Sequence, residues 1–321
     1  MKKTVVLLFV ALLVIAGCAP KAIKLENKYI PGETLRYRME ASGKGAMTLS
    51  GLPEEKEATS IDMDIHLEMD SSQKVLAVDE EGTADLELSY DRLIEKITSA
   101  GQTMEIIADK DATIMRQNGK VIYDSTAPKA EGRPSPFEGF IGQSMTMKVT
   151  KTGKILEVKG FERLKRLTPQ LDIQGMIKQS QPAFPEKEVR IGESWTQDVE
   201  LPLPQVGKPV TIETKYTLKG FEKIKGYNCA RIEAKTDVLL TDLVFDMSLG
   251  KPQTEVGMVI DRLSQKMEGM LYFAHKEGKL VKSDQDVDMS MEMTTKMKRE
   301  GKEMEMKTKM DMKMKVVMEL Q

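Results

Sequence analysis

Apolar and polar side chains alternate along most of this chain, and the alternation predicts β-strands. A clear example places an apolar residue at every second position, namely Ile61, Met63, Ile65, Leu67 and Met69, with acidic residues or histidine between them. Successive side chains of a strand point to opposite faces, so such a strand has one apolar and one polar face. Strands of this kind are typical of antiparallel sheets that are wet on one side. Glycine-containing turn signals separate the alternating segments, as at Asn118-Gly119 and Glu277-Gly278.

The C-terminal part predicts a long hairpin with a methionine-rich face. Residues 287–297 and 304–320 alternate almost throughout, and Arg299-Glu300-Gly301-Lys302 supplies the turn. The methionines that we expect on the apolar face are Met289, Met291, Met293, Met304, Met306, Met310, Met312 and Met314. A straight return strand would span ~56 Å at ~3.3 Å per residue, a length that suits a curved sheet.

Two segments depart from the alternation and suggest a division of the chain. Residues 125–139 are rich in proline and glycine and predict an irregular loop. Residues 161–180 have apolar residues at roughly helical spacing, followed by Pro182 and Pro185. We therefore expect a mainly β protein with long antiparallel strands in two curved sheets or half-barrels. The first half, residues 30–180, would end in a short helical segment, and the second half would be residues 181–321.

The two predicted halves begin with similar residues. Pro31-Gly32-Glu33-Thr34 opens the first, and Ile191-Gly192-Glu193-Ser194 opens the second. The later spacings in the two halves differ, and a competing similarity pairs Gly160-Phe161 with Gly220-Phe221. An internal duplication is a hypothesis that the sequence leaves open.

The N-terminus has the pattern of a bacterial lipoprotein signal. Lys2 and Lys3 precede an apolar run over residues 5–16, and Ile15-Ala16-Gly17-Cys18 follows. This order is typical of a secretory signal, and it resembles a lipobox, in which the cysteine is lipidated and becomes the new N-terminus. We predict a signal peptide over residues 1–17, lipidation of Cys18 and a tether over residues 18–29. Ala19 in place of an aspartate favours the outer membrane, with the body facing the periplasm.

Composition narrows the classes of function. The formal net charge is −2, so no basic excess indicates nucleic acid, and aromatic residues make up only 5% of the chain. With Cys18 lipidated, Cys229 has no intramolecular partner, and we expect it to be a buried structural thiol within a strand.

Catalytic and metal-binding motifs are missing from the sequence. His66 lies in an acidic alternating stripe, and His275 precedes a predicted turn, so we expect both to be exposed. Asp284, Asp286 and Asp288 have the spacing that begins a calcium loop, but Met289 and Thr295 stand where glycine and glutamate are required. Trp195, the single tryptophan, is expected to anchor the core of the second half. We predict a protein that is not an enzyme and has no cofactor.

Three interpretations of the predicted methionine-rich side of this hairpin remain open. It is an ordinary core face, or a compliant surface for an acyl chain, because methionine is flexible and polarisable. Alternatively it binds copper(I), which prefers soft thioether ligands.

Three motifs resemble those of uncharacterised bacterial envelope lipoproteins. They are the strand start at the end of residues 185–195, the Gly-Tyr-x-Cys-x-x-Ile strand from Gly226 to Ile232, and the late hairpin Gly278-Lys279-Leu280-Val281. The long amphipathic strands also resemble the half-barrels of lipoprotein-localisation (Lol-type) carriers. These resemblances imply a membrane-anchored, non-catalytic lipoprotein that binds an apolar ligand or lipid or has a structural role in the envelope. The alternative is a methionine-rich periplasmic copper(I)-binding protein.

Overall fold

The computed structural model describes residues 22–51, 58–127, 141–160, 177, 181–201, 210–246, 254–299 and 302–321. Every element named in this part of the chain is a β-strand. The strands are β1 (Thr34–Ser50), β2 (Thr59–Val78), β3 (Ala84–Ser99), β4 (Gln102–Asp109), β5 (Thr113–Gln117), β6 (Lys120–Asp124), β7 (Ser144–Val149), β8 (Ile155–Lys159), β9 (Ser194–Leu201), β10 (Val210–Ile224), β11 (Tyr227–Asp246), β12 (Thr254–Ala274), β13 (Lys279–Arg299) and β14 (Lys302–Leu320). The expected mainly β, antiparallel class is confirmed.

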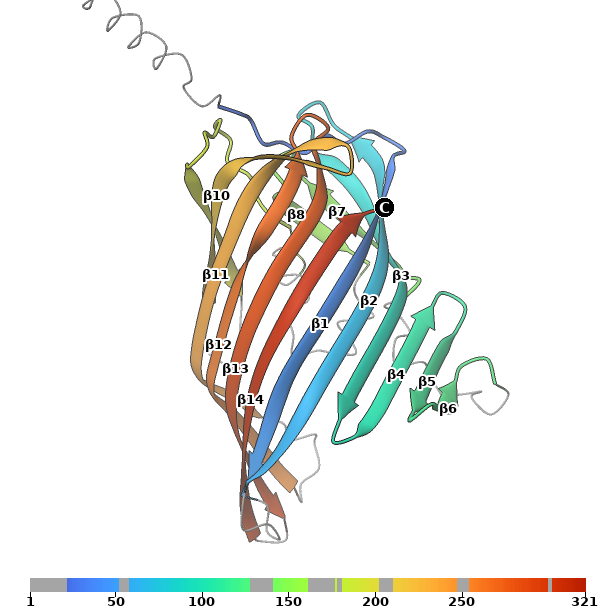
Figure 1. The fold of residues 1–321 in the computed structure, drawn as a ribbon, viewed down its shortest axis with the longest axis vertical. Coiled ribbons are helices and arrows are strands. Elements are labelled where there is room, and N and C mark those ends of the chain that lie inside the picture. The colour runs from blue at the N-terminus through green and yellow to red at the C-terminus, as the bar shows by residue number, and fades with distance from the viewer. Residues whose placement is uncertain are drawn as a thin grey trace, which may run out of the picture.

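The strands form one sheet, and the expectation of two sheets is wrong. The order is β6-β5-β4-β3-β2-β1-β14-β13-β12-β11-β10-β9, with β7 paired with β3 and β8 paired with β7. The first long strand pairs with the last, from Tyr37 opposite Leu320 to Ser50 opposite Lys307. This seam joins the N-terminal and C-terminal strands into a continuous sheet that is curved but not closed (Figure 1).

The short helical segment expected within residues 161–180 is not borne out. The named elements are all strands, and of this range the structure describes Ile177 alone, which packs beside the cluster around Leu86. The loop expected over residues 125–139 lies mostly outside the described residues as well. Within the described residues, we find no helix of the length and apolarity needed to cross a membrane.

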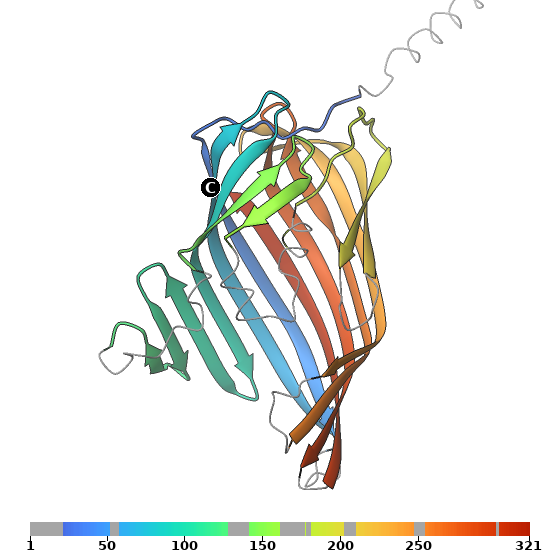
Figure 2. The same ribbon diagram turned by 180° about the vertical axis from the view of Figure 1, so that it is seen from behind.

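The curvature gives the sheet an inner and an outer face. Figure 2 shows the inner side, where β7 and β8 lie across the upper part of the sheet. Cross-strand partners project on the same face, so the register identifies the inner residues. Met318 lies opposite Ser283, which lies opposite Leu271, and Leu271 lies opposite Ile232. Ile232 and Leu271 belong to the main buried cluster, so the row that contains Met318 is on the inner face.

The best-packed core lies at the upper end of the sheet, where β12 turns into β13. One buried cluster contains Leu218, Ile232 and Phe273 of the sheet together with Ile23, Leu25, Phe184 and Val189. A second cluster seats Met147 and Val149 of β7 on Leu86 of β3. Most of these side chains are almost fully buried, and the inner rows farther from this end are mainly half-buried.

The N-terminal residues are part of this packed end. Ile23 exchanges two backbone hydrogen bonds with Val189, and Leu25 is fully buried. The amide of Asn27 donates to Lys151 O, and that of Lys28 donates to Gly278 O. The expected tether over residues 18–29 is therefore integrated into the body from Ile23 onward.

The similar sequences at the start of the two halves fold into the same turn. Gly32 and Gly192 both have positive φ, at 85° and 90°, which glycine adopts without steric cost. The amide of Gly32 donates to Val75 O, and Val75 donates back to Glu33 O. Gly192, Leu218 and Glu193 repeat this pair of hydrogen bonds. The repeat supports the duplication hypothesis at these two strand starts.

Candidate apolar ligand surface

Register brings the predicted methionines together with others on the inner face. One row runs Ile61–Met47–Met310–Met291–Leu263 across five strands. The next row runs Met63–Gly45–Met312–Met289–Gln265, and the following one runs Ile65–Gly43–Met314–Val287–Met267. We call the inner residues Met47, Met63, Met267, Met289, Met291, Met293, Met310, Met312 and Met314 the methionine face.

Three members of this surface were missing from the predicted hairpin face. Met47, Met63 and Met267 lie on β1, β2 and β12, which flank the hairpin in the sheet. The alternation around Met63 marked it as apolar, but nothing local indicates that β1 lies beside β14. Met304 and Met306, which were predicted, lie beyond the end of β1 and pair with Met297 and Thr295. They extend the same hairpin face without the β1 neighbours.

The methionine face is apolar and incompletely packed. From the Met39 row to the Leu49 row, inner positions of β1, β2, β12, β13 and β14 carry no Asp, Glu, Lys or Arg. Met312 is 7% exposed, whereas Met289, Met291, Met310 and Met314 are half-buried. A fully packed core would bury these side chains more completely, so this face retains accessible thioether surface.

Two glycines let β1 pass close to β14 on this face. A Cβ on Gly45 would lie 2.4 Å from Asp311 O, and one on Gly43 would lie 2.4 Å from Met314 Cγ. Side chains are therefore excluded at these points of the seam. Long methionine side chains from β14 lie beside the glycine positions.

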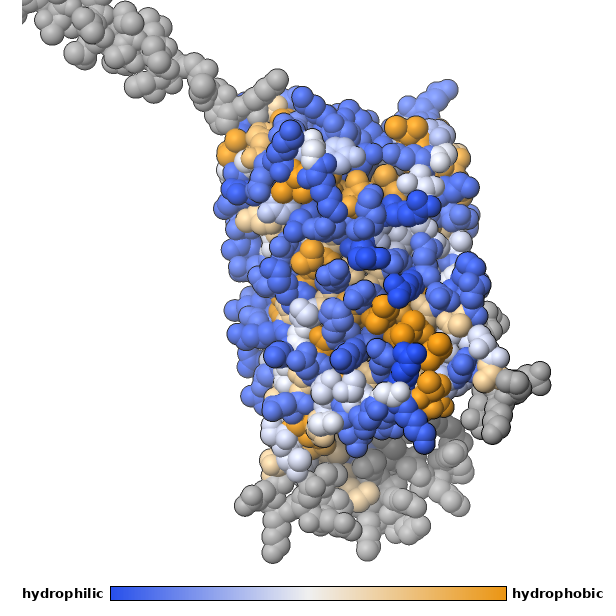
Figure 3. All heavy atoms as spheres, turned by 45° about the vertical axis from the view of Figure 1, so that its right-hand side comes forward, coloured by the Kyte–Doolittle hydropathy of each residue, from blue (hydrophilic) through white to orange (hydrophobic). Residues whose placement is uncertain are grey.

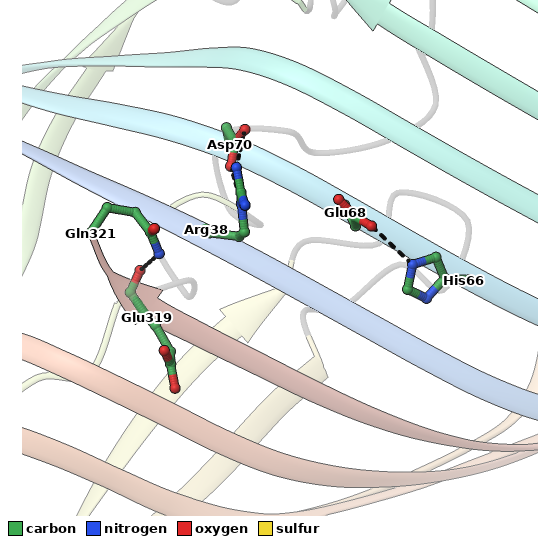
Figure 4. Close-up of polar contacts among 6 residues, drawn as sticks. All are labelled: Arg38, His66, Glu68, Asp70, Glu319 and Gln321. Carbon is green, nitrogen blue, oxygen red and sulfur yellow. Dashed lines mark hydrogen bonds and ion pairs between the residues drawn. The ribbon is translucent and has the colours of Figure 1, made fainter. Parts of the chain in front are cut away.

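The outer face of the sheet carries many charged side chains that form ion pairs and hydrogen bonds. Arg38 donates two hydrogen bonds to Asp70, at 2.7 and 3.0 Å, and His66 Nε2 lies 3.2 Å from Glu68 Oε1 (Figure 4). Lys315 pairs with Asp284 at 3.1 Å, and Ser290 donates to Asp311 at 2.6 Å. Figure 3 shows a mainly hydrophilic surface on this side of the molecule, interrupted by an apolar patch. The apolar surface that the sequence predicted is thus confined largely to the inner side of these central strands.

Ion pairs also connect the C-terminal end of β14 to neighbouring elements. Glu319 lies 3.0 Å from Lys225 and 3.1 Å from Lys282, and hydrogen bonds from these two lysines lower the pKa of the Glu319 carboxyl. Lys225 Nζ donates in addition to Leu320 O at 2.7 Å.

Other predicted residues occupy structural positions. Cys229 is fully buried, as expected, and burial raises the pKa of its thiol. Trp195 stacks on Tyr216 with ring centroids 5.5 Å apart, and its Nε1 donates to Ala183 O, so it packs against the main core as predicted. Cys18 lies outside the described residues.

The side chain of His66 is 45% exposed, in line with the expectation, whereas His275 is more covered than expected. His66 lies on the outer face, and His275 is half-buried beside the ring of Phe221, 5.4 Å away. Burial is the largest cause that lowers the pKa of His275. Across the described ranges, no three His, Cys, Asp or Glu residues are grouped so that they could hold a metal ion.

Comparison with known proteins gives one partial match. Residues 81–172 match the model of a family of unknown function (DUF6263). The matched range includes β3 to β8 and leaves the methionine-rich hairpin outside it. No curated protein matches the chain. The chain is therefore similar, over this part, to an uncharacterised family.

Proposed function

We propose that the inner face of the sheet binds the acyl chains of a lipid or a similar apolar ligand, without catalysis. The observation that carries this proposal is the half-buried methionine face, which crosses five strands without an ionisable Asp, Glu, Lys or Arg.

The chemistry of methionine suits ligands of variable shape. The unbranched thioether side chain adopts many rotamers and adapts its contacts to an acyl chain. Each buried methylene contributes roughly 0.8 kcal/mol, so a chain of ten methylenes offers about 8 kcal/mol before the costs of association.

A curved, open antiparallel sheet with one apolar face is also the arrangement that the likeness to Lol-type carriers implies. The likeness is one of architecture and carries no function by itself. It does add to the proposal, because those carriers hold acyl chains against such a face.

We place the protein at the cell envelope, anchored by lipid on Cys18 and facing the periplasm from the outer membrane. Residues 19–22 separate Cys18 from Ile23, which is fixed to Val189. Four extended residues reach roughly 14 Å, so the anchor would hold the packed upper end close to the membrane.

Labelled palmitate tests the anchor. It should enter the wild-type chain and fail to enter a Cys18→Ser variant, which should appear in the soluble periplasmic fraction or as an uncleaved precursor. A wild-type chain that takes up no label would refute lipidation.

Titration with a fluorescent fatty acid tests the ligand surface. Met291→Glu places a charge in the middle of the methionine face and should weaken binding at least tenfold. The matched control is Leu239→Glu on β11, since Leu239 is 59% exposed and opposite Ser264 on the outer face. Equal affinities in the two folded variants would contradict the proposal.

Copper(I) binding is the second candidate, and the register favours it in one respect. Met291 lies opposite Met310, and Met310 lies opposite Met47, so thioethers from three strands are neighbours. Soft sulfur ligands suit copper(I). Stoichiometric copper(I) bound by the wild type and lost in a Met310→Leu, Met312→Leu, Met314→Leu variant would support this alternative over the lipid.

A further inference from the structure

We propose that the methionine face is a site of reversible sulfoxidation, and that the modification converts it from an apolar to a polar surface. The predicted effect on ligand binding rests on the function proposed above, whereas the position of the modification rests on the structure alone. The oxidant is a two-electron oxygen donor, such as a hydroperoxide or a hypohalous acid.

Accessibility separates several methionines of the sheet into two groups, and Met312 of the methionine face, at 7% exposed, belongs to the buried group. Met291, Met310 and Met314 are half-buried on the inner face. Met145 and Met147, by contrast, are 4% and 2% exposed, and Met147 is enclosed in the β3–β7 cluster. An oxidant in solution reaches the first group and is kept from the second. The susceptibility of a methionine sulfur to oxidation increases with its exposure to solvent.

Cys229, the free thiol of the described residues, is protected from the same oxidants, whereas Trp195 is only partly buried. Cys229 is fully buried, and the raised pKa of its thiol disfavours the reactive thiolate. Trp195 is stacked on Tyr216 and packed against the core. Among the described sulfur groups, the accessible thioethers are therefore the first targets in and around the inner face.

The reaction balances without a protein cofactor. The thioether sulfur attacks the terminal oxygen of the oxidant, an S–O bond forms, and the O–O bond of a hydroperoxide breaks. Sulfur loses two electrons, and the hydroperoxide is reduced to an alcohol or to water. Methionine sulfoxide reductases reverse the change, with separate enzymes for the two sulfoxide epimers.

The sheet should survive the modification. The inner-face thioethers make no ladder hydrogen bonds, which belong to the backbone. The clusters around Phe273 and Leu86 at the upper end contain none of the residues of the methionine face. Sulfoxides would therefore place polar S=O groups on the inner face of a folded molecule and reduce its affinity for acyl chains.

Peptide mapping by mass spectrometry after limited hydrogen peroxide treatment of the folded full chain tests the site. Met291, Met310 and Met314 should be converted at least fivefold faster than Met145 and Met147. Similar rates for the two groups would overturn the assignment, whatever the ligand of the face.

Ligand protection links the site to the proposed function. Oleate should slow oxidation of Met291 and Met310 and leave Met270 unchanged, because Met270 is half-buried but faces outward between Glu233 and Asp284. The oxidised protein should lose at least tenfold in affinity for a fluorescent fatty acid, with its circular dichroism retained. Treatment with both reductases should restore binding.

The outcomes distinguish the two proposals. If the unoxidised protein binds no fatty acid, the proposed function fails, and the mapped rates still decide the modification site. If fatty acid binds but oxidation of the face leaves its affinity unchanged, the inference of a polarity switch fails.

Discussion

Methionine in place of leucine or isoleucine is the residue choice that characterises the inner face. A branched side chain fills a fixed shape, whereas methionine has three rotatable bonds and a polarisable sulfur. The positions of the methionine face differ in burial, since Met312 is 7% exposed and Met291 is half-buried. The two residues should therefore respond differently to truncation.

Truncating these two methionines should separate packing from ligand contact. Met312→Ala should lower the free energy of unfolding by ~2–4 kcal/mol, because it removes buried contacts and leaves a cavity. Met291→Ala should cost ~1 kcal/mol or less, because its side chain is partly hydrated already. Chemical denaturation measures both, with Met312→Leu as a nearly neutral control. Equal losses at the two positions would mean that the face is an ordinary, uniformly packed core.

Gly45 should resist substitution because of its place at the seam between β1 and β14. In Gly45→Ala the new Cβ would meet Asp311 O at 2.4 Å, so the strands must separate locally. We expect a loss of ~1–3 kcal/mol, as for overpacking in a close-packed region. Gly257→Ala on β12 is the matched control, since a Cβ added there would meet no atom within 4 Å. Thermal unfolding of the two variants measures the difference, and equal melting temperatures would contradict the account.

The strands themselves could be predicted from the alternation, because the two-residue period records which side chains face the core. The predicted segments 287–297 and 304–320 fall within β13 (Lys279–Arg299) and β14 (Lys302–Leu320). The burial of Cys229 also followed from its apolar strand. The partial burial of His275 did not, because the ring of Phe221 that covers it comes from another hairpin.

The C-terminal end of β14 depends on ion pairs with two other elements. Glu319 accepts from Lys225 in the β10–β11 turn and from Lys282 on β13, and the pKa of Glu319 is lowered. A carboxyl with a lowered folded-state pKa stabilises the fold above its unfolded pKa of about 4.5, and that stabilisation is lost as the pH falls further.

Substitution of Glu319 should show this pH dependence. Glu319→Gln should reduce the free energy of unfolding by about 0.5–1 kcal/mol at pH 7, since the group is partly exposed and screened by solvent. The difference from the wild type should shrink as the pH falls below about 4.5 and through the lowered folded-state pKa, where the wild-type carboxyl also becomes neutral. Urea titrations at pH 7 and pH 3.5 measure it, and a difference that is independent of pH would argue against the ion pairs.

At the scale of the molecule, one sheet connects what the sequence divides into two halves. The pairing of β1 with β14 joins residues that are 257 to 283 positions apart, from Ser50 with Lys307 to Tyr37 with Leu320, and an alternating pattern does not specify its neighbour. Nearly every long strand here has one apolar face, so many partners satisfy the same pattern. The composition of the methionine face was therefore predictable for the hairpin, whereas the contribution of Met47 and Met63 required the topology.

Packing is dense at the upper end of the sheet and looser on its central inner face, and the two regions have different roles in our account. The upper end, with Leu25 and Phe273 buried, stabilises the fold and holds the N-terminal residues. The central inner face has less complete burial and no charge on its methionine rows. If the inner face binds a ligand as proposed, a molecule built in this way would keep its fold while the ligand is exchanged.

Native mass spectrometry of the full chain, purified in mild detergent from a bacterial envelope, tests the central claim most directly. We predict a species with one additional lipid mass, held non-covalently beyond any acyl groups on Cys18. That species should be absent from the Met291→Glu variant and present in the Leu239→Glu variant. A wild-type protein that carries no lipid mass, or that carries copper in its place, would contradict the account.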